Sequence, residues 1–269
     1  MINKWYVVSA AQCDDHDDEV VEEVRLGEWK VKDVDKFDQR NCKYSNEDQK
    51  QDCERHQLCG TNCIYENPLS DCETCPELQD IKVATVRKHP NFRKTKDGIP
   101  VDDIMLIKLS KPAVYNRLVK PVCLPPPDFD NLLGEERHTP GYFKHKNVVV
   151  GWGKTNNTQY YYYNSVASYQ QKLTTPLLSN DECIEQFKRL VPEVSVEILL
   201  EEYLCAGGVQ EEDSCSGDSG GPLIGREQPA DPFILIGVVS LGTKPCALGA
   251  PTVYTRVSHY RSWIINHMS

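Results

Sequence analysis

The chain has 269 residues, twelve cysteines and a formal net charge of −10. The negative charge argues against nucleic acid as the main partner, and the longest apolar run, residues 233–239, is far shorter than the ~20 residues of a membrane-spanning helix. The cysteines indicate an oxidising compartment, and the length is sufficient for a full hydrophobic core.

In chain order, the predicted elements are mostly β-strands bounded by Gly and Pro turns. We expect strands near residues 5–10, 80–87, 104–109, 147–152, 233–241 and 252–255. Ser179 and Glu182 form a capping box, which predicts a helix that ends near Leu190. Residues 258–268 predict a second helix at the C-terminal end, and the Pro-rich stretch 125–130 predicts a linker between two units, 1–125 and 126–269.

The first unit contains a Cys-rich insertion at about residues 30–80. Six cysteines allow fifteen pairings, and the sequence does not choose among them. The last four have a spacing that also fits a zinc site, but an oxidising context favours three local disulfides. We therefore expect a disulfide-closed insertion with no metal, and no motif in the chain indicates a cofactor. The six cysteines are Cys42, Cys53, Cys59, Cys63, Cys72 and Cys75.

The segment DSCSGDSGGPL, which starts at Asp213, has the composition of a nucleophile turn. Glycines flank Ser219 on both sides, so the backbone can turn tightly and leave the hydroxyl exposed. The same turn can direct the amides of Gly217 and Ser219 at one point, where an oxyanion would lie. The segment therefore predicts a serine nucleophile with an oxyanion hole.

Further segments resemble the trypsin-like serine proteases, in the order that a chymotrypsin-type catalytic triad requires. They are WYVVSAAQC from Trp5, DDIMLIKL from Asp102, VVGWGKT, SLGTKPC and PTVYTRVSHYRSWI. VRLGEW, HPNF and VCLPPP are most similar to arthropod clip-domain proteases and their non-catalytic homologues. The resemblance implies an all-β, chymotrypsin-like fold of two six-stranded antiparallel β-barrels with a C-terminal helix. It also implies that N-terminal strands of the first barrel are missing from this chain.

The resemblance also implies roles for particular residues. Ser219 and Asp103 correspond to triad members, and the amides of Gly217 and Ser219 to the oxyanion hole. Asp218 corresponds to the carboxylate that pairs with the new N-terminal ammonium after activating cleavage. Asp213, Ser240, Gly242 and Thr252 correspond to residues of the family's specificity pocket. Cys183–Cys205 and Cys215–Cys246 correspond to two of the family's disulfides. No metal site is assigned.

Gln12 stands where the family carries the catalytic histidine. A carboxamide has no nitrogen that titrates near neutral pH, so it can hydrogen-bond to a serine but cannot accept its proton and return it to the leaving group. Loss of the histidine costs ~10⁶ in turnover in a comparable apparatus. Gln12 therefore predicts a catalytically impaired protein, unless it is a variant of an active enzyme.

We expect Asp218 to lack its ammonium partner, because the chain begins inside the first barrel. A buried carboxylate without a partner costs several kcal/mol, so we expect the oxyanion turn to be poorly formed.

The pocket residues give a mixed indication of specificity. Asp213 precedes Ser219 by six residues, the spacing typical of a preference for Arg or Lys. Thr252 stands where trypsin-like members usually have glycine, and its branched side chain should narrow the pocket. We therefore expect a weakened preference for basic side chains.

Three functions follow as alternatives. The first is a serine protease homologue that acts through protein partners in an extracellular proteolytic cascade. The second is an active endopeptidase that cleaves after Arg or Lys, and the third is an incomplete gene fragment. We expect a secreted protein with protein substrates or cascade partners, without a membrane or nucleic acid partner. We attribute the absence of a signal peptide to truncation.

Overall fold

The computed structural model describes residues 1–14, 20–28, 78–132, 147–154, 167, 169–190, 201–210, 212–226, 228, 230–243 and 246–268. The six insertion cysteines lie outside these residues, so their predicted pairing stays a prediction.

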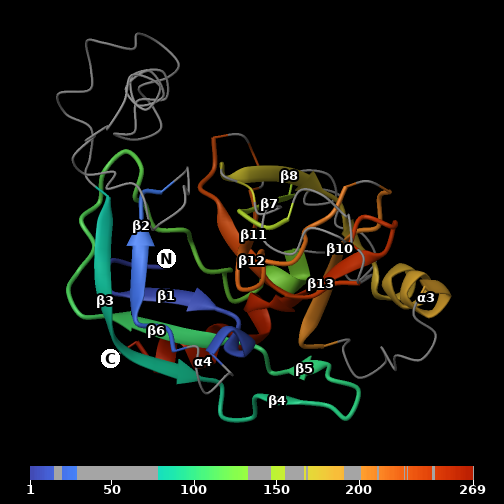
Figure 1. Cartoon of the computed structure of the whole chain (residues 1–269), viewed down its shortest axis with the longest axis horizontal. Helices are drawn as coiled ribbons and strands as arrows, with labels where there is room; N and C mark the ends of the chain where they lie inside the picture. The colour runs from blue at the N-terminus through green and yellow to red at the C-terminus, as the bar shows by residue number, and fades with distance from the viewer. Residues whose placement is uncertain are drawn as a thin grey trace, which may run out of the picture.

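The first sheet is antiparallel, with the strand order β1-β6-β3-β2 (Figure 1). Its strands are β1 (Tyr6–Ser9), β2 (Glu23–Leu26), β3 (Gln79–Lys88) and β6 (Met105–Leu109). Apolar side chains of β3 and β6 form its core, with Ile81, Met105 and Leu109 each at most 1% exposed. The long strand β3 is bulged between Val83 and Thr85, which adds twist and lets the sheet curl.

The second sheet has seven antiparallel strands in the order β8-β7-β11-β12-β13-β10-β9. Its core contains Leu223, Ile236 and Tyr254, which are almost fully buried. The strands are β7 (Asn147–Gly151), β8 (Gln171–Thr175), β9 (Leu177–Leu178), β10 (Tyr203–Gly207), β11 (Pro222–Gly225), β12 (Ile234–Leu241) and β13 (Pro251–Arg256). Two further strands, β4 (Arg93–Lys94) and β5 (Pro100–Val101), form a small two-stranded sheet. The remaining elements are the 3-10 helix η1 (Ala11–Asp14) and the short helix α2 (Phe129–Leu132).

The two longer helices begin and end close to their predicted positions. Helix α3 (Asn180–Leu190) has the predicted capping box: the Glu182 amide donates to Ser179 Oγ at 3.1 Å, and Ser179 N donates to Glu182 Oε2 at 2.8 Å. Helix α4 (Val257–Asn266) buries Tyr260 and Ile264 in one cluster with residues of β1, β6 and β12. The C-terminal helix therefore packs against both sheets.

The architecture confirms the fold class expected from the resemblance: two curled, antiparallel sheets and a C-terminal helix. Several short strands were not predicted. β8 is largely polar and β10 is buried at every position, so neither has the alternation that marks a half-buried strand. None of the helices within the described ranges combines the length and the apolar composition that a membrane span requires.

Candidate active site

The segment after β1 carries Gln12 to a buried carboxylate. Its backbone amide donates to Asp103 Oδ1 at 2.8 Å. Its side-chain Nε2 donates to Asp103 Oδ2 at 2.8 Å and to the Ser240 carbonyl oxygen at 2.6 Å. Both of these partners are acceptors only, so the amide nitrogen must face them and the carbonyl Oε1 must point away. Asp103 and Ser240 thus fix the orientation of the carboxamide.

Asp103 is fully buried immediately before β6. Besides the two bonds from Gln12, its Oδ2 accepts a hydrogen bond from Ser240 Oγ at 2.6 Å, and its main-chain oxygen accepts one from Thr255 Oγ1 at 2.8 Å. Burial raises the pKa of Asp103 above its ordinary value, while the hydrogen bonds from Ser240 and Gln12 act in the opposite direction. The carboxyl therefore accepts hydrogen bonds from two parts of the chain, around Gln12 and Ser240, and Thr255 holds its main chain.

The preceding residue, Asp102, supports this position, and the sequence analysis did not identify that role. Asp102 has a φ of 53°, in the left-handed region that a non-glycine residue rarely adopts. Its Oδ1 accepts a hydrogen bond from the Tyr260 hydroxyl at 3.1 Å and lies 3.1 Å from His89 Nδ1. His89, directly after β3, and Tyr260 of α4 thus contact the turn that precedes Asp103. In the sequence, the position of Asp102 directly before Asp103 was the feature that could have indicated this role.

Ser219 lies exposed in a tight turn before β11. Gly217 in this turn has a φ of 102°, which strongly favours glycine. Within the described part of the chain, the amides of Gly217 and Ser219 donate to no acceptor. The turn also packs against the segment that carries Gln12, because Ser9 Oγ donates to the Gly220 carbonyl oxygen at 3.3 Å. The fold therefore brings the Gln12 and Ser219 segments together.

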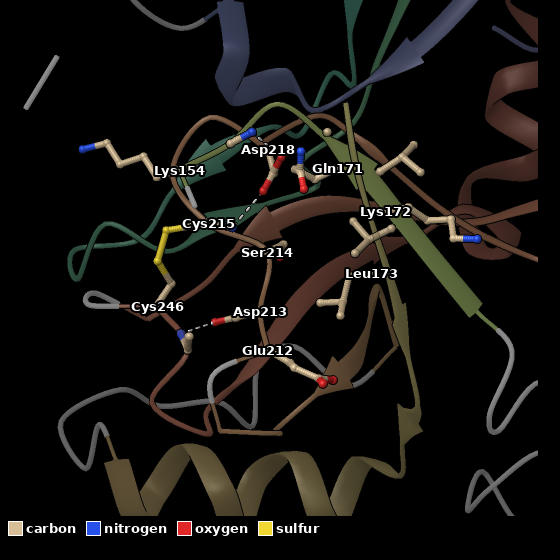
Figure 2. Close-up of a pocket in the computed structure, with 15 residues that line it drawn as sticks. Lys154, Gln171, Lys172, Leu173, Glu212, Asp213, Ser214, Cys215, Asp218 and Cys246 are labelled. Atoms are coloured by element: carbon tan, nitrogen blue, oxygen red, sulfur yellow. Dashed lines mark hydrogen bonds between the residues drawn. A yellow bond between two sulfur atoms is a disulfide. The ribbon is translucent and has the colours of Figure 1, made fainter. Parts of the chain in front are cut away.

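Asp218 lines a cavity of about 260 Å³ (Figure 2). Its Oδ1 accepts a hydrogen bond from Gly153 N at 2.8 Å, and its Oδ2 accepts one from Cys215 N at 2.9 Å. The carboxylate fills the space beside two glycines: an added Cβ would lie 1.9 Å from it at Gly151 and 2.3 Å at Gly153. Each oxygen of the carboxylate therefore accepts one amide hydrogen, and the expected lack of an ammonium partner stays a prediction.

Asp213 lies on the other side of the same loop, beside the Cys215–Cys246 disulfide (Figure 2). Thr252 Oγ1 donates to its Oδ1 at 2.7 Å, and Ala247 N donates to its Oδ2 at 3.0 Å. Burial raises the pKa of Asp213, while these two hydrogen bonds lower it. Thr252 also lies 2.9 Å from Ser214 Oγ, so its hydroxyl is part of a buried polar network with the carboxylate.

The other predicted features are arranged as follows. The second expected disulfide, Cys183–Cys205, joins α3 to β10. Ser240 and Thr252 lie on β12 and β13, and Gly242 directly follows β12, with the Thr252 hydroxyl 3.6 Å from the position of an added Cβ. Among the described residues, no group of three or more His, Cys, Asp or Glu residues is arranged to hold a metal ion.

Comparisons with known proteins show which family the chain resembles. The family model described as Trypsin matches residues 71–264. The chain is 31% identical over 265 residues to phenoloxidase-activating factor 3 of Holotrichia diomphalia, covering 98% of this chain and 61% of that protein. It is 31% identical over 273 residues to the CLIP domain-containing serine protease HP8 of Bombyx mori, covering 100% and 60%.

A third relative, the CLIP domain-containing serine protease B10 of Anopheles gambiae, is 34% identical over 270 residues, covering 98% of this chain and 59% of that protein. The chain thus spans about 60% of the length of these curated relatives. The predicted similarity to trypsin-like proteases, and to arthropod clip-domain proteases in particular, is confirmed.

Proposed function

Because the chain belongs to the trypsin family of serine proteases, we propose that it is a catalytically impaired member that acts by binding protein partners in an extracellular proteolytic cascade. The observation that carries the proposal is the contact between Gln12 and Asp103. Gln12 Nε2 donates to the buried carboxylate at 2.8 Å, as an imidazole would from one of its nitrogens. The side that would face Ser219 is then a carbonyl oxygen, which can accept a hydrogen bond but not a proton.

In this proposal, the rest of the hydrolytic apparatus is retained for binding. Ser219 would contact the scissile carbonyl of a bound chain, and the amides of Gly217 and Ser219 would donate to its oxygen. The Asp218 cavity suits an ammonium group, because three carboxylates, Glu212, Asp213 and Asp218, are among its lining residues, against two lysines, Lys154 and Lys172. We infer that Asp218 takes up a new N-terminus after cleavage.

The proposed pocket is formed by Asp213, Ser240, Gly242 and Thr252, and we infer that it has reduced affinity for Arg and Lys. The Thr252 hydroxyl occupies one oxygen of Asp213, and the Ala247 amide occupies the other. A guanidinium would have to displace the threonine hydroxyl to make a bidentate contact with the carboxylate. The threonine methyl group would also take up space that glycine leaves open.

The names of two relatives suggest the biological process in which this chain acts. One is named a phenoloxidase-activating factor and another a CLIP domain-containing serine protease. By analogy, we propose that this chain is secreted and acts on, or beside, other proteases and their protein substrates. The two described disulfides are in keeping with an oxidising compartment.

Hydrolysis assays test the proposed impairment. We expect the protein to cleave Arg- and Lys-containing ester and peptide substrates no faster than its Ser219→Ala variant, because the Gln12 carboxamide cannot accept the Ser219 proton. Steady-state rates for the two proteins on the same substrates are the measurement. Ser219-dependent turnover within about a hundredfold of an ordinary trypsin-like enzyme would favour the alternative function, an active endopeptidase.

The pocket prediction is tested with benzamidine, a small planar cation that fits a carboxylate-based pocket. We expect Thr252→Gly to bind it at least ~10-fold more tightly than the unmodified protein, because the substitution frees both space and one oxygen of Asp213. Thr252→Val is the matched control, since it keeps the bulk and removes the hydroxyl. Isothermal titration calorimetry gives the affinities, and equal affinity in all three proteins would exclude Thr252 as a determinant.

A further inference from the structure

A cluster of exposed aromatic, aliphatic and basic side chains lies on the first sheet, outside the proposed active site. Val114 is 66% exposed, Tyr115 48% and Trp5 37%. We call this cluster the Trp5–Tyr115 surface. Its members are Lys4, Trp5, Lys111, Val114, Tyr115, Arg117 and Lys120, all of them exposed.

Backbone hydrogen bonds join the two segments that form this surface. Ala113 N donates to the Lys4 carbonyl oxygen at 2.7 Å, and Leu109 N donates to the Trp5 carbonyl oxygen at 2.8 Å. The segment before β1 therefore runs beside the loop that follows β6. In Figure 1 this loop lies at the outer edge of the first sheet, on the side away from the second sheet.

The loop is held in one conformation by polar side chains. Gln79 Oε1 accepts from Val114 N at 2.7 Å, and Gln79 Nε2 donates to the Val114 carbonyl oxygen at 2.8 Å. Asn116 Oδ1 accepts from the amides of Leu118 and Val119 at 2.8 Å each. With its backbone fixed, the loop presents Val114 and Tyr115 to solvent at a small entropic cost on binding.

The charge of the surface is opposite to that of the chain. Residues 1–13 and 104–127 contain five basic residues and no Asp or Glu, whereas the net charge of the chain is −10. Among the described residues, Lys4, Lys111, Arg117 and Lys120 form no ion pair. Their charge is therefore available to an approaching anionic group.

We propose that the Trp5–Tyr115 surface docks an acidic polypeptide segment that also carries apolar side chains. Trp, Tyr and Arg are the residues most enriched among those that contribute binding energy at protein interfaces. The basic side chains around them would speed association and select a negatively charged partner. An aliphatic group such as Val114 suits the apolar side chains of a peptide better than a sulfated polysaccharide. This proposal does not depend on the catalytic state of Ser219.

The test uses a fluorescein-labelled peptide in which Glu alternates with Leu and Phe, titrated with the 269-residue protein and followed by fluorescence anisotropy. We expect Lys111→Glu/Arg117→Glu to weaken binding by at least ~10-fold. Tyr115→Ser should weaken it by about 5-fold or more, and Tyr115→Phe should keep most of the affinity. Ser219→Ala should bind as the unmodified protein does, which separates this site from the active site.

The matched control is Arg87→Glu/Lys96→Glu, which makes the same change of charge at two exposed positions elsewhere on the described surface. It should leave the peptide affinity within about twofold, since screening limits distant charges. Unchanged thermal unfolding midpoints would show that the variants are folded. Equal weakening by this control, or a Tyr115→Ser variant that binds the peptide normally, would overturn the proposal. So would a heparin oligosaccharide that binds as tightly as the peptide and is unaffected by Tyr115→Ser.

Discussion

Replacing Gln12 with histidine is expected to raise Ser219-dependent hydrolysis by at least ~10³-fold when the Asp218 cavity holds an ammonium group. Asp103 already presents an oxygen to this side chain at 2.8 Å, and the Ser240 carbonyl oxygen lies on the same side. An imidazole in this position would donate one N–H to Asp103 and turn its other nitrogen toward Ser219. It would thereby supply the missing general base.

The ammonium can be supplied by a dipeptide with a free, apolar N-terminal residue, added at millimolar concentration. We expect the dipeptide alone to have no effect on the Gln12 protein, and Gln12→His alone to gain much less than the two together. Residues that act as one catalytic unit are strongly non-additive, so the four rates decide the point. Gln12→Ala is the control for side-chain removal. If Gln12→His with dipeptide stayed at the level of its Ser219→Ala variant, Gln12 would not be the limiting defect.

Replacing Asp103 with alanine is expected to lower the free energy of unfolding by about 3 kcal/mol. The carboxyl is fully buried and accepts hydrogen bonds from the Gln12 amide, Gln12 Nε2 and Ser240 Oγ. Without it, buried donors lose their acceptor and a cavity remains. The thermal midpoint should fall by about 5–10 °C. The exposed Asp97→Ala is the control, expected within about 0.5 kcal/mol of the unmodified protein.

The pH dependence of this difference follows from the pKa of Asp103. Burial raises it above the ordinary value of 3.8, so the carboxyl binds a proton more tightly in the folded state than in the unfolded state. The resulting stabilisation is complete below the unfolded-state pKa and is lost as the pH rises through the folded-state pKa. The free-energy difference between the unmodified protein and Asp103→Ala should therefore be larger at acidic than at alkaline pH. Denaturant unfolding across this range measures it, and a difference that grows with pH would contradict the sign.

Much of the fold could be predicted from local sequence. β6 and β12 are short, strongly apolar segments, and the Ser179–Glu182 box sets the start of α3 by side-chain chemistry within one turn. The strands that were missed have no such signal. β4 and β5 have two residues each, too few to show an alternation of polar and apolar side chains. Their pairing of Arg93 with Val101 depends on the surrounding tertiary structure.

The candidate site could be predicted as a set of residues but not as a set of contacts. The motifs around Gln12, Asp103 and Ser219 indicated which residues to examine. They did not indicate that Asp218 accepts the amides of Gly153 and Cys215, because these bonds depend on how two distant loops pack. Nor did they show that the Thr252 hydroxyl donates directly to Asp213. The support of Asp102 by Tyr260 is likewise a tertiary contact, 158 residues apart in sequence.

The rate at which a fluorophosphonate labels Ser219 tests the central claim most directly, because the reaction requires an activated serine but no particular peptide substrate. The measurement compares the Gln12 protein with its Gln12→His variant, both with the dipeptide present and with Ser219→Ala as the blank. Our account predicts labelling at least ~10³-fold faster in the histidine variant. Rapid labelling of Ser219 in the Gln12 protein, at the rate of the histidine variant, would contradict it.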